Sequence, residues 1–340
     1  MFLLVQMENY ALGAPTFKDV EAAEQNLQGT IHATPAQYSD IVSLSAKNEV
    51  FLKLENLQRT GSYKLRGAFH KFANLTRERS PNGIISPVTG NHAEGIAYAA
   101  RFHGVSCTLV MPKSTPVAKI QAAEGHRAHV QLFGQTYSDA YQKAQELARM
   151  QHYTWLDPFD DPFMVAGQAT IGLEILTQIP AASAVVVPMG GGALAGGIAL
   201  ALKSMNPKIK VYGVDAVNPA EFSRSQSPRE PNLDGTVEKV RLEEMTPPKS
   251  SPMNLELVRR YVDDLVRVRE EEIWQAMILL MEHHKLVSDQ EGASALAAVI
   301  QGKIPTQTGD VAVLVSGGNV DMNLLPQILS QGLKGSHGIS

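Results

Sequence analysis

Short apolar segments alternate with longer amphipathic segments along most of this chain. The apolar segments are continuous runs, as at residues 105–111 and 184–188, and do not alternate with polar positions. A continuous run of this length is typical of a strand that is buried on both faces of a parallel sheet. On this basis we predict strands over residues 50–55, 83–88, 105–111, 128–133, 184–188, 210–215, 265–268 and 311–316.

The segments between these strands have the composition and apolar spacing of helices. We predict helices over residues 62–75, 91–102, 116–124, 137–150, 165–178, 270–284 and 292–301, and a further one that begins at residue 193. The alternation of strands and helices predicts an α/β fold with open parallel sheets covered by helices on both faces. Residues 223–253 are rich in Ser, Pro and charged residues without a sustained period, and we interpret them as a surface excursion.

Composition and charge narrow the class of protein. The 340 residues are 44% hydrophobic and 19% charged, which indicates a well-buried globular enzyme. The formal net charge is −4 and no dense run of Lys or Arg appears, so we expect no nucleic-acid partner. A single cysteine, Cys107, excludes an intramolecular disulfide. The apolar start of the chain is short and no segment approaches a membrane span, so we expect a cytoplasmic protein without a membrane partner.

Three polar or glycine-rich segments directly follow predicted strands, at residues 89–93, 190–194 and 316–319. In open α/β sheets, ligands bind outside the carboxyl ends of the strands. The triple glycine 190–192 precedes a helix and suits an anion such as phosphate, although a tight turn is an alternative. Taken alone, Asn91 could be a helix cap, His92 a packed histidine and Lys64 a solvated lysine. Their joint occurrence at strand ends favours a binding site.

Together these segments resemble the fold-type II pyridoxal-phosphate enzymes. The resemblance rests on Lys-Leu-Glu-Asn-Leu-Gln-Arg-Thr-Gly-Ser-Tyr-Lys-Leu-Arg-Gly-Ala at residues 53–68, on Thr-Gly-Asn-His-Ala at 89–93, on segment 157–168, on the triple glycine and on Ser-Gly-Gly-Asn-Val-Asp at 316–321. The resemblance covers roughly residues 28–330. Within the family, the segments are most similar to the threonine/serine dehydratase and serine racemase branch. The resemblance implies two open parallel-sheet domains of the tryptophan synthase β-like type. We expect residues 1–75 and 164–340 to form the large cofactor-binding domain and residues 76–163 the small domain.

The resemblance implies a role for individual residues. Lys64 would carry pyridoxal phosphate as a Schiff base and then remove the substrate's α-proton. Tyr63 would lie against the pyridine ring, Asn91 would bond the ring oxygen and Ser316 would meet the ring nitrogen. The backbone N–H groups of the following residues would hold the phosphate: Gly190, Gly191, Gly192, Ala193 and Leu194. The substrate carboxylate would bind at Thr89, Gly90, Asn91 and His92.

Ser316 and Thr89 determine the reaction that the resemblance implies. A neutral hydroxyl at Ser316 cannot keep the pyridine nitrogen protonated, which favours β-elimination. We therefore expect L-threonine or L-serine to lose its β-hydroxyl as water and to yield a 2-oxo acid and ammonia. Thr89 stands where similar racemases carry a serine, and the methyl group of threonine restricts its rotamer, which disfavours racemisation. Serine racemase and a 3-hydroxyaspartate dehydratase are the alternative enzymes. Segment 287–294 borders the site and leaves the substrate choice open. A non-catalytic amino-acid-binding protein on the same fold is the alternative outside enzymes.

A cation and a partner subunit are further expectations from the resemblance. Asp215 ends a strand and Glu221 follows six residues later, and both carboxylates suit Mg²⁺ or Ca²⁺. Two ordinary surface carboxylates are the alternative. Relatives of this kind imply a homodimer or homotetramer. Only 24 residues follow Ser316, so we expect the short, catabolic type of enzyme without a regulatory domain.

Overall fold

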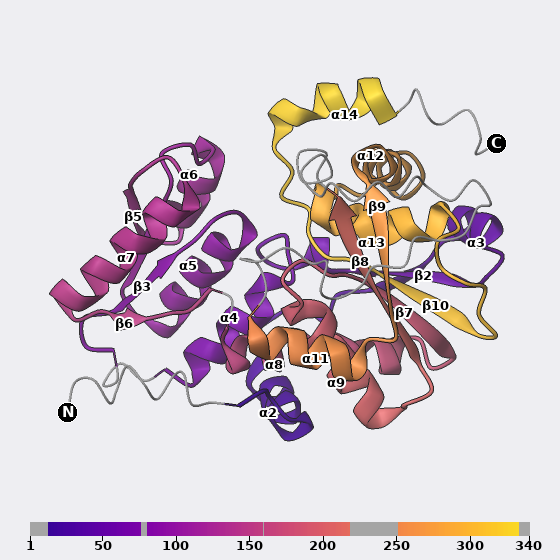
Figure 1. The fold of residues 1–340 in the computed structure, drawn as a ribbon, viewed down its shortest axis with the longest axis horizontal. Helices are drawn as coiled ribbons and strands as arrows, with labels where there is room; N and C mark the ends of the chain where they lie inside the picture. The colour runs from indigo at the N-terminus through magenta and orange to yellow at the C-terminus, as the bar shows by residue number, and fades with distance from the viewer. Residues whose placement is uncertain (1–12, 76–79, 159, 218–250, 333–340) are drawn as a thin grey trace. The chain divides into compact units, whose positions relative to one another are not determined.

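The computed structural model describes residues 13–75, 80–158, 160–217 and 251–332 (Figure 1). They form two compact units, and each unit is built around its own sheet. Unit 1 comprises Met1–His32 and Gln58–Thr170, and unit 2 comprises Ala33–Leu57 and Ile171–Ser340. The predicted α/β class, with open sheets covered by helices, is confirmed. The surface excursion predicted at residues 223–253 lies almost wholly outside the described residues.

Unit 1 contains a four-stranded parallel sheet with the strand order β5-β4-β3-β6. Its strands are β3 (Ile84–Pro87), β4 (Cys107–Met111), β5 (His129–Leu132) and β6 (Thr154–Trp155). Successive residues point to opposite faces of the sheet. Ile84 accordingly belongs to the apolar core under α4 and α5, whereas Ile85 packs against α7. The helices are α2 (Phe17–Leu27), α4 (Lys64–Ala73), α5 (Asn91–His103), α6 (Val117–Gly125), α7 (Tyr137–Gln151) and α8 (Pro162–Gln178), whose last residues are counted with unit 2.

Unit 2 contains a six-stranded sheet with the order β1-β2-β10-β7-β8-β9, in which only the edge strand β1 is antiparallel. The strands are β1 (Ala36–Tyr38), β2 (Val50–Leu54), β7 (Ala182–Pro188), β8 (Lys210–Val217), β9 (Asp264–Arg269) and β10 (Asp310–Val315). Two helices, α12 (Glu270–Leu279) and α13 (Gln290–Ile300), cover one face, and α9 (Ala193–Met205) and α11 (Pro252–Tyr261) cover the other (Figure 1). The remaining elements are α3 (Asp40–Ala46), α14 (Leu325–Gly332), the short helices η1 (Glu55–Leu57) and η4 (Met322–Leu324), and the π-helical turn η3 (Leu280–His284). No helix within the described ranges is both long enough and apolar enough to cross a membrane.

Both sheets change direction at a central strand. In unit 1 the chain moves outward from β3 through β4 to β5, and β6 then lies on the other side of β3. In unit 2 it moves from β7 through β8 to β9, and β10 then lies on the other side of β7. Such switch points open a crevice at the carboxyl ends of the strands, where ligands bind in α/β sheets. The topology therefore directs attention to the loops that follow β3, β7 and β10.

The compact units do not share the boundaries of the two domains predicted from the sequence. Residues 58–75 lie with the four-stranded sheet because α4 packs against α5 and α2. The resemblance instead implies that these residues belong with residues 164–340. The compact units describe internal contacts only, and the division into a large cofactor-binding domain and a small domain stays a prediction.

Lys53 lies in a buried polar cluster inside unit 2. Its side chain is fully buried, and its Nζ donates to the carboxylate of Glu174, to the carbonyl oxygen of Thr34 and, at 3.0 Å, to Oε1 of Gln178. A buried ammonium group is tolerated only when such partners replace its water. The cluster therefore fixes the end of β2, beside which the Ser316 loop lies.

We expect Lys53→Met to lower the free energy of unfolding by about 3 kcal/mol, because the largely buried Glu174 carboxylate would lose its cation. Urea unfolding monitored by circular dichroism measures this change. The matched control is Lys210→Met on β8, which removes an exposed lysine 3.0 Å from Asp263 and should barely shift the urea midpoint. Equal midpoints for the two variants would contradict a stabilising role for the buried pair.

Candidate active site

Lys64 is the first residue of α4 and directly follows the buried Tyr63. The preceding turn is closed by a 2.8 Å hydrogen bond from the N–H of Gly61 to the carbonyl oxygen of Gln58, and Gly61 adopts a φ of +67°. Glycine is suited to this left-handed conformation because it lacks a Cβ atom. The Nζ atom of Lys64 lies 4.7 Å from the centroid of the Tyr63 ring. The turn thus places an amine against an aromatic face at the start of a helix.

The turn after β3 lies beside this amine within unit 1. Gly90 has φ 60° and ψ −144°, a conformation that other residues rarely adopt, and α5 begins at Asn91. A Cβ atom on Gly95 would lie 3.3 Å from the carbonyl carbon of Lys64 and from the nitrogen of Leu65. The absence of this atom lets the first turns of α4 and α5 approach closely. Lys64 and the Thr89–His92 turn, which the sequence predicts as site residues, are therefore brought together.

His92 is a buried, neutral histidine at this turn. The pKa of His92 is lowered from 6.5 to about 3, mainly by burial and secondly by the charge of Lys64. Its Nε2 atom has no hydrogen-bond partner among the described residues. A buried nitrogen without a partner is costly, so this atom has unused capacity to bond a polar ligand.

The lowered pKa of His92 predicts a pH dependence of stability. Above pH 6.5 the histidine is neutral in both states, but below it the unfolded chain takes up a proton that the folded protein refuses. Stability should therefore fall as the pH is lowered, by roughly 2–3 kcal/mol between about pH 6.5 and 4.5 for this group. His92→Gln should flatten the profile measured by urea unfolding, whereas His129→Gln, at an exposed position of β5, should leave it unchanged. Identical slopes for wild type and His92→Gln would contradict the prediction.

The glycine-rich loop after β7 forms the first part of the candidate site in unit 2. Gly190 and Gly192 adopt φ values of +48° and +87°, and Gly192 is the N-cap of α9. The first N–H groups of a helix lack intrahelical acceptors and carry the positive end of its dipole. Ala193 and Leu194 belong to this first turn. The loop therefore has the features of a phosphate-binding site.

Ser316 follows β10, the neighbour of β7, and is 1% exposed. Because β7 and β10 are parallel, Ser316 and the glycine-rich loop lie at the same edge of the sheet. The carbonyl oxygen of Gly317 accepts hydrogen bonds from the Ser288 hydroxyl and the Asp289 N–H, both at 3.0 Å. A Cβ atom on Gly292 would lie only 2.2 Å from this oxygen. The Ser316 loop is thus fixed by the start of α13.

Two residues at this edge were not identified as site residues from the sequence. A Cβ atom on Gly190 would lie 3.1 Å from Oε1 of Glu291, so this carboxylate lies beside the glycine-rich loop. Asn56 donates through Nδ2 to the carbonyl oxygen of Val287 at 3.0 Å and holds the segment before α13. In the sequence, the only feature that distinguishes Glu291 is its position in the first turn of an apolar helix. Acidic residues are common there for electrostatic reasons alone, so the pattern does not single it out.

The predicted cation ligands are only partly described. Asp215 lies on β8, where its Oδ2 is 3.8 Å from Nε of Arg267. Glu221 lies outside the described residues. Within the part of the chain that the structure describes, no group of three or more His, Cys, Asp and Glu side chains could hold a metal ion.

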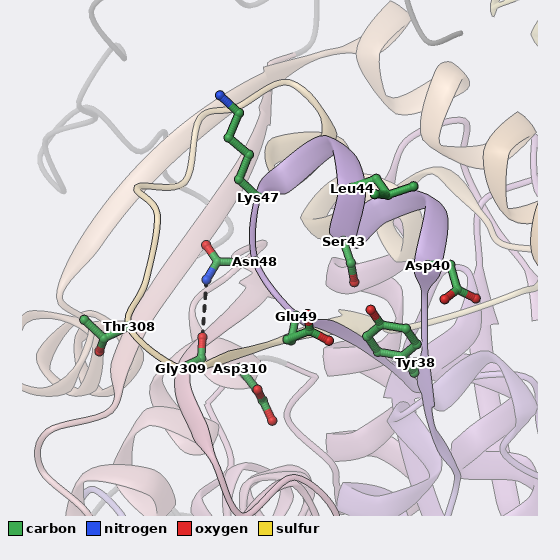
Figure 2. Close-up of a pocket in the computed structure, with 10 residues that line it drawn as sticks. All are labelled: Tyr38, Asp40, Ser43, Leu44, Lys47, Asn48, Glu49, Thr308, Gly309 and Asp310. Carbon is green, nitrogen blue, oxygen red and sulfur yellow. Dashed lines mark hydrogen bonds between the residues drawn. The ribbon is translucent and has the colours of Figure 1, made fainter.

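A hollow of about 580 Å³ lies elsewhere in unit 2, where β2 and β10 begin (Figure 2). Its lining includes Asp40, Glu49 and Asp310, and Figure 2 shows the Asn48 amide donating to the carbonyl oxygen of Gly309 at 3.3 Å. Ser316 follows the opposite end of β10. The hollow is therefore separate from the candidate active site.

The residues present fit pyridoxal phosphate. Each unit, taken by itself, carries groups that suit part of this molecule. Unit 1 has an amine at a helix start. Unit 2 has a glycine-rich loop at a helix N-terminus and a buried hydroxyl at the same sheet edge. Ser62 Oγ, two residues before Lys64, is also buried without a hydrogen-bond partner in the described ranges. Orphaned polar atoms beside the lysine are expected where a polar ligand supplies the missing bonds.

Comparison with known proteins identifies the family of this chain. The family model described as "Pyridoxal-phosphate dependent enzyme" matches residues 27–317. The chain is 39% identical to the L-threonine ammonia-lyase of Thermotoga maritima, over 94% of this chain and 79% of that protein. It is 41% identical to the L-threonine dehydratase catabolic TdcB of Staphylococcus aureus, over 93% of this chain and 92% of the relative.

Solved structures show the same fold. Serine racemase from Dictyostelium discoideum superposes with a TM-score of 0.78 at 30% identity, covering 91% of this chain and 99% of the racemase. A processed threonine deaminase isoform 2 from Solanum lycopersicum gives a TM-score of 0.81 at 27% identity, covering 96% and 92% of the two chains. On these matches, the chain belongs to the family of pyridoxal-phosphate dependent enzymes.

Proposed function

We propose that this protein is an ammonia-lyase that converts L-threonine, L-serine or both into a 2-oxo acid and ammonia. The observation that carries the proposal is the buried hydroxyl of Ser316, which is held at the same sheet edge as the glycine-rich loop. A hydroxyl at the position that we assign to the ring nitrogen favours elimination, since a neutral group does not stabilise a protonated ring nitrogen as a carboxylate would. The relatives named as threonine ammonia-lyase and dehydratase support the same reaction.

The proposed mechanism assigns each step to a residue of this chain. When bound, the cofactor withdraws electrons from the substrate's α-carbon and so makes the α-proton removable. Lys64 would hold the cofactor through Nζ, and once that bond is exchanged for the substrate amine, Nζ would accept the α-proton. The ammonium group so formed would return this proton to the departing β-hydroxyl, which leaves as water. The resulting enamine tautomerises to an imine, which one water molecule hydrolyses to the 2-oxo acid and ammonia. The Thr89–His92 turn orients the substrate through its carboxylate.

Further contacts to the cofactor are proposed on the basis of the resemblance. The N–H groups of residues 190–194 bind its phosphate, Asn91 donates to its ring oxygen, and Tyr63 packs on its ring. The conformations of Gly190 and Gly192 and the helix N-terminus of α9 support the first assignment. The start of α5 beside Lys64 supports the others.

Product analysis tests the proposed reaction. The holoenzyme is incubated with L-threonine, L-serine and 3-hydroxyaspartate, and the 2-oxo acid, ammonia and D-amino acid are quantified. We expect equal amounts of 2-oxo acid and ammonia from L-threonine or L-serine. A D-enantiomer as the main product would indicate the racemase alternative, in which the exposed Thr89 hydroxyl serves the second face of the substrate. Protein that takes up no pyridoxal phosphate would indicate a non-catalytic amino-acid-binding protein.

The finer properties are proposals that rest on the resemblance. We propose a homodimer or homotetramer in the cytoplasm, which light scattering and cell fractionation would test. A Mg²⁺ or Ca²⁺ site at Asp215 and Glu221 has weaker support, because the guanidinium of Arg267 already lies near Asp215. Isothermal titration of EDTA-treated protein with each cation would decide whether one binds.

A further inference from the structure

The start of α6 lies beside the turn that we assign to the substrate carboxylate. Strands β3 and β4 are parallel neighbours, paired from Ile84 with Cys107 to Pro87 with Val110. The connections that follow them therefore leave the sheet at the same edge, and α5 and α6 pack against each other. A Cβ atom on Gly90 would lie 3.7 Å from Nζ of Lys119, which belongs to the first turn of α6. The ammonium group of Lys119 is thus in contact distance of the turn.

Among the described residues, Lys119 has no acidic partner. No carboxylate of the described residues lies within 4.0 Å of its Nζ, although the side chain is half-buried. The acidic residue in the first turn of α5, Glu94, lies 3.8 Å from Nε2 of His126 instead. A partly buried cation is usually paired with an anion. The position of Lys119 against Gly90 indicates where that anion binds.

The other donors of this turn carry no full charge. Asn91 and Gly90 can offer amide N–H groups, and burial lowers the pKa of His92 to about 3, so its ring is neutral at physiological pH. Lys64 is assigned to the covalent attachment of the cofactor and is therefore not counted as a carboxylate ligand. A carboxylate that enters this turn would therefore find neutral hydrogen-bond donors and one adjacent ammonium group, Lys119.

We propose that Nζ of Lys119 binds the α-carboxylate of the amino-acid substrate at the Thr89–Asn91 turn. The inference rests on the proposed function and deepens it, since it names the charged group that selects an α-amino acid over an amine or amide. A charge-assisted hydrogen bond is stronger than a neutral one, and it fixes the carboxylate in one direction. The same contact orients the α-carbon relative to Lys64, which lies in the same unit.

The test compares Lys119→Gln and Lys119→Arg with the matched control Lys113→Gln. Lys113 is an exposed lysine in the same connection between β4 and α6. For each holoenzyme, kcat and KM are measured for L-threonine and for L-threonine amide, which lacks the carboxylate charge. Cofactor content and the absorbance of the bound cofactor are recorded in parallel.

Lys119→Gln should raise KM for L-threonine by about 10- to 100-fold and leave kcat within about 3-fold, because an interaction common to ground and transition states is lost. The preference of the wild type for the acid over the amide should shrink by the same factor. Lys119→Arg should restore KM to within a few-fold, and Lys113→Gln should match wild type. Cofactor content should be unchanged in all variants.

Three results would overturn the inference. They are an unchanged KM for L-threonine in Lys119→Gln, an equal loss for acid and amide, and a loss confined to 3-hydroxyaspartate, which would assign Lys119 to a second carboxylate. Failure of the proposed function is a separate result, in which the wild type forms no 2-oxo acid from any substrate. In that case, titration of L-threonine followed by the cofactor's absorbance still compares wild type with Lys119→Gln.

Discussion

A Lys64→Ala variant is expected to lose roughly 10⁴-fold or more in kcat, because covalent attachment and a positioned base would be removed together. The variant should still fold, since the Lys64 side chain is only half-buried and alanine favours the helix that begins there. Cofactor should bind weakly and should wash out on dialysis. The loss should far exceed any effect on stability, and for this reason activity and unfolding must be measured on the same preparation.

Borohydride reduction followed by mass spectrometry makes this prediction specific. In the wild type, reduction should fix the cofactor to the peptide that contains Lys64, and in Lys64→Ala it should fix none. Lys143→Ala on α7, where the lysine pairs with Glu146 at 2.9 Å, is the control and should behave as wild type. Undiminished turnover by Lys64→Ala, or cofactor fixed to another lysine of the wild type, would refute the assignment.

Gly292→Ala is expected to lower kcat/KM by at least about 100-fold and the free energy of unfolding by about 3 kcal/mol. The new Cβ atom would lie 2.2 Å from the carbonyl oxygen of Gly317, a backbone atom that cannot rotate away. Either α13 or the Ser316 loop must shift. Because the Ser288 hydroxyl and the Asp289 N–H bond the same oxygen, a shift would also weaken the contacts that fix Ser316.

Gly125→Ala provides the control for this substitution. Gly125 ends α6, and a Cβ atom there would meet no atom within 4 Å, so stability should be unchanged or slightly increased. Steady-state kinetics, urea unfolding and the fluorescence of the bound cofactor distinguish the two variants. Activity of Gly292→Ala within a few-fold of wild type would show that the Ser316 loop tolerates displacement.

Hydrophobic patterning predicts most of the secondary structure. Apolar runs mark β7 and β10 because both strands are buried between layers of helices. The edge strand β1 escapes detection, since its three residues are largely exposed and form no apolar run. Helix α11 begins at Pro252, at the end of a segment whose polar composition favours a surface excursion. Short or polar elements depend on tertiary pairing that patterning does not reveal.

The candidate site is predictable only where it is encoded locally. Lys64, Asn91 and Ser316 stand in short motifs next to predicted strands and helices, and the structure places these motifs at helix starts and strand ends. Their roles in binding and catalysis stay predictions. Glu291 and Lys119 lie against glycines far from them in sequence, and a contact of this kind depends on strand order and helix packing. The apolar periodicity of a single sequence does not reveal such a contact.

The central position of β10 has a consequence for the order of folding. Strand β10 is the last strand among the described residues, yet it lies between β2 and β7 in the sheet of unit 2. The four strands of unit 1 come from one continuous stretch, so that sheet can close while the ribosome is still synthesising unit 2. Until β10 emerges, β2 and β7 expose unpaired edges, which are prone to aggregation. Nascent chains should therefore depend on chaperones mainly during the interval between the synthesis of β7 and that of β10.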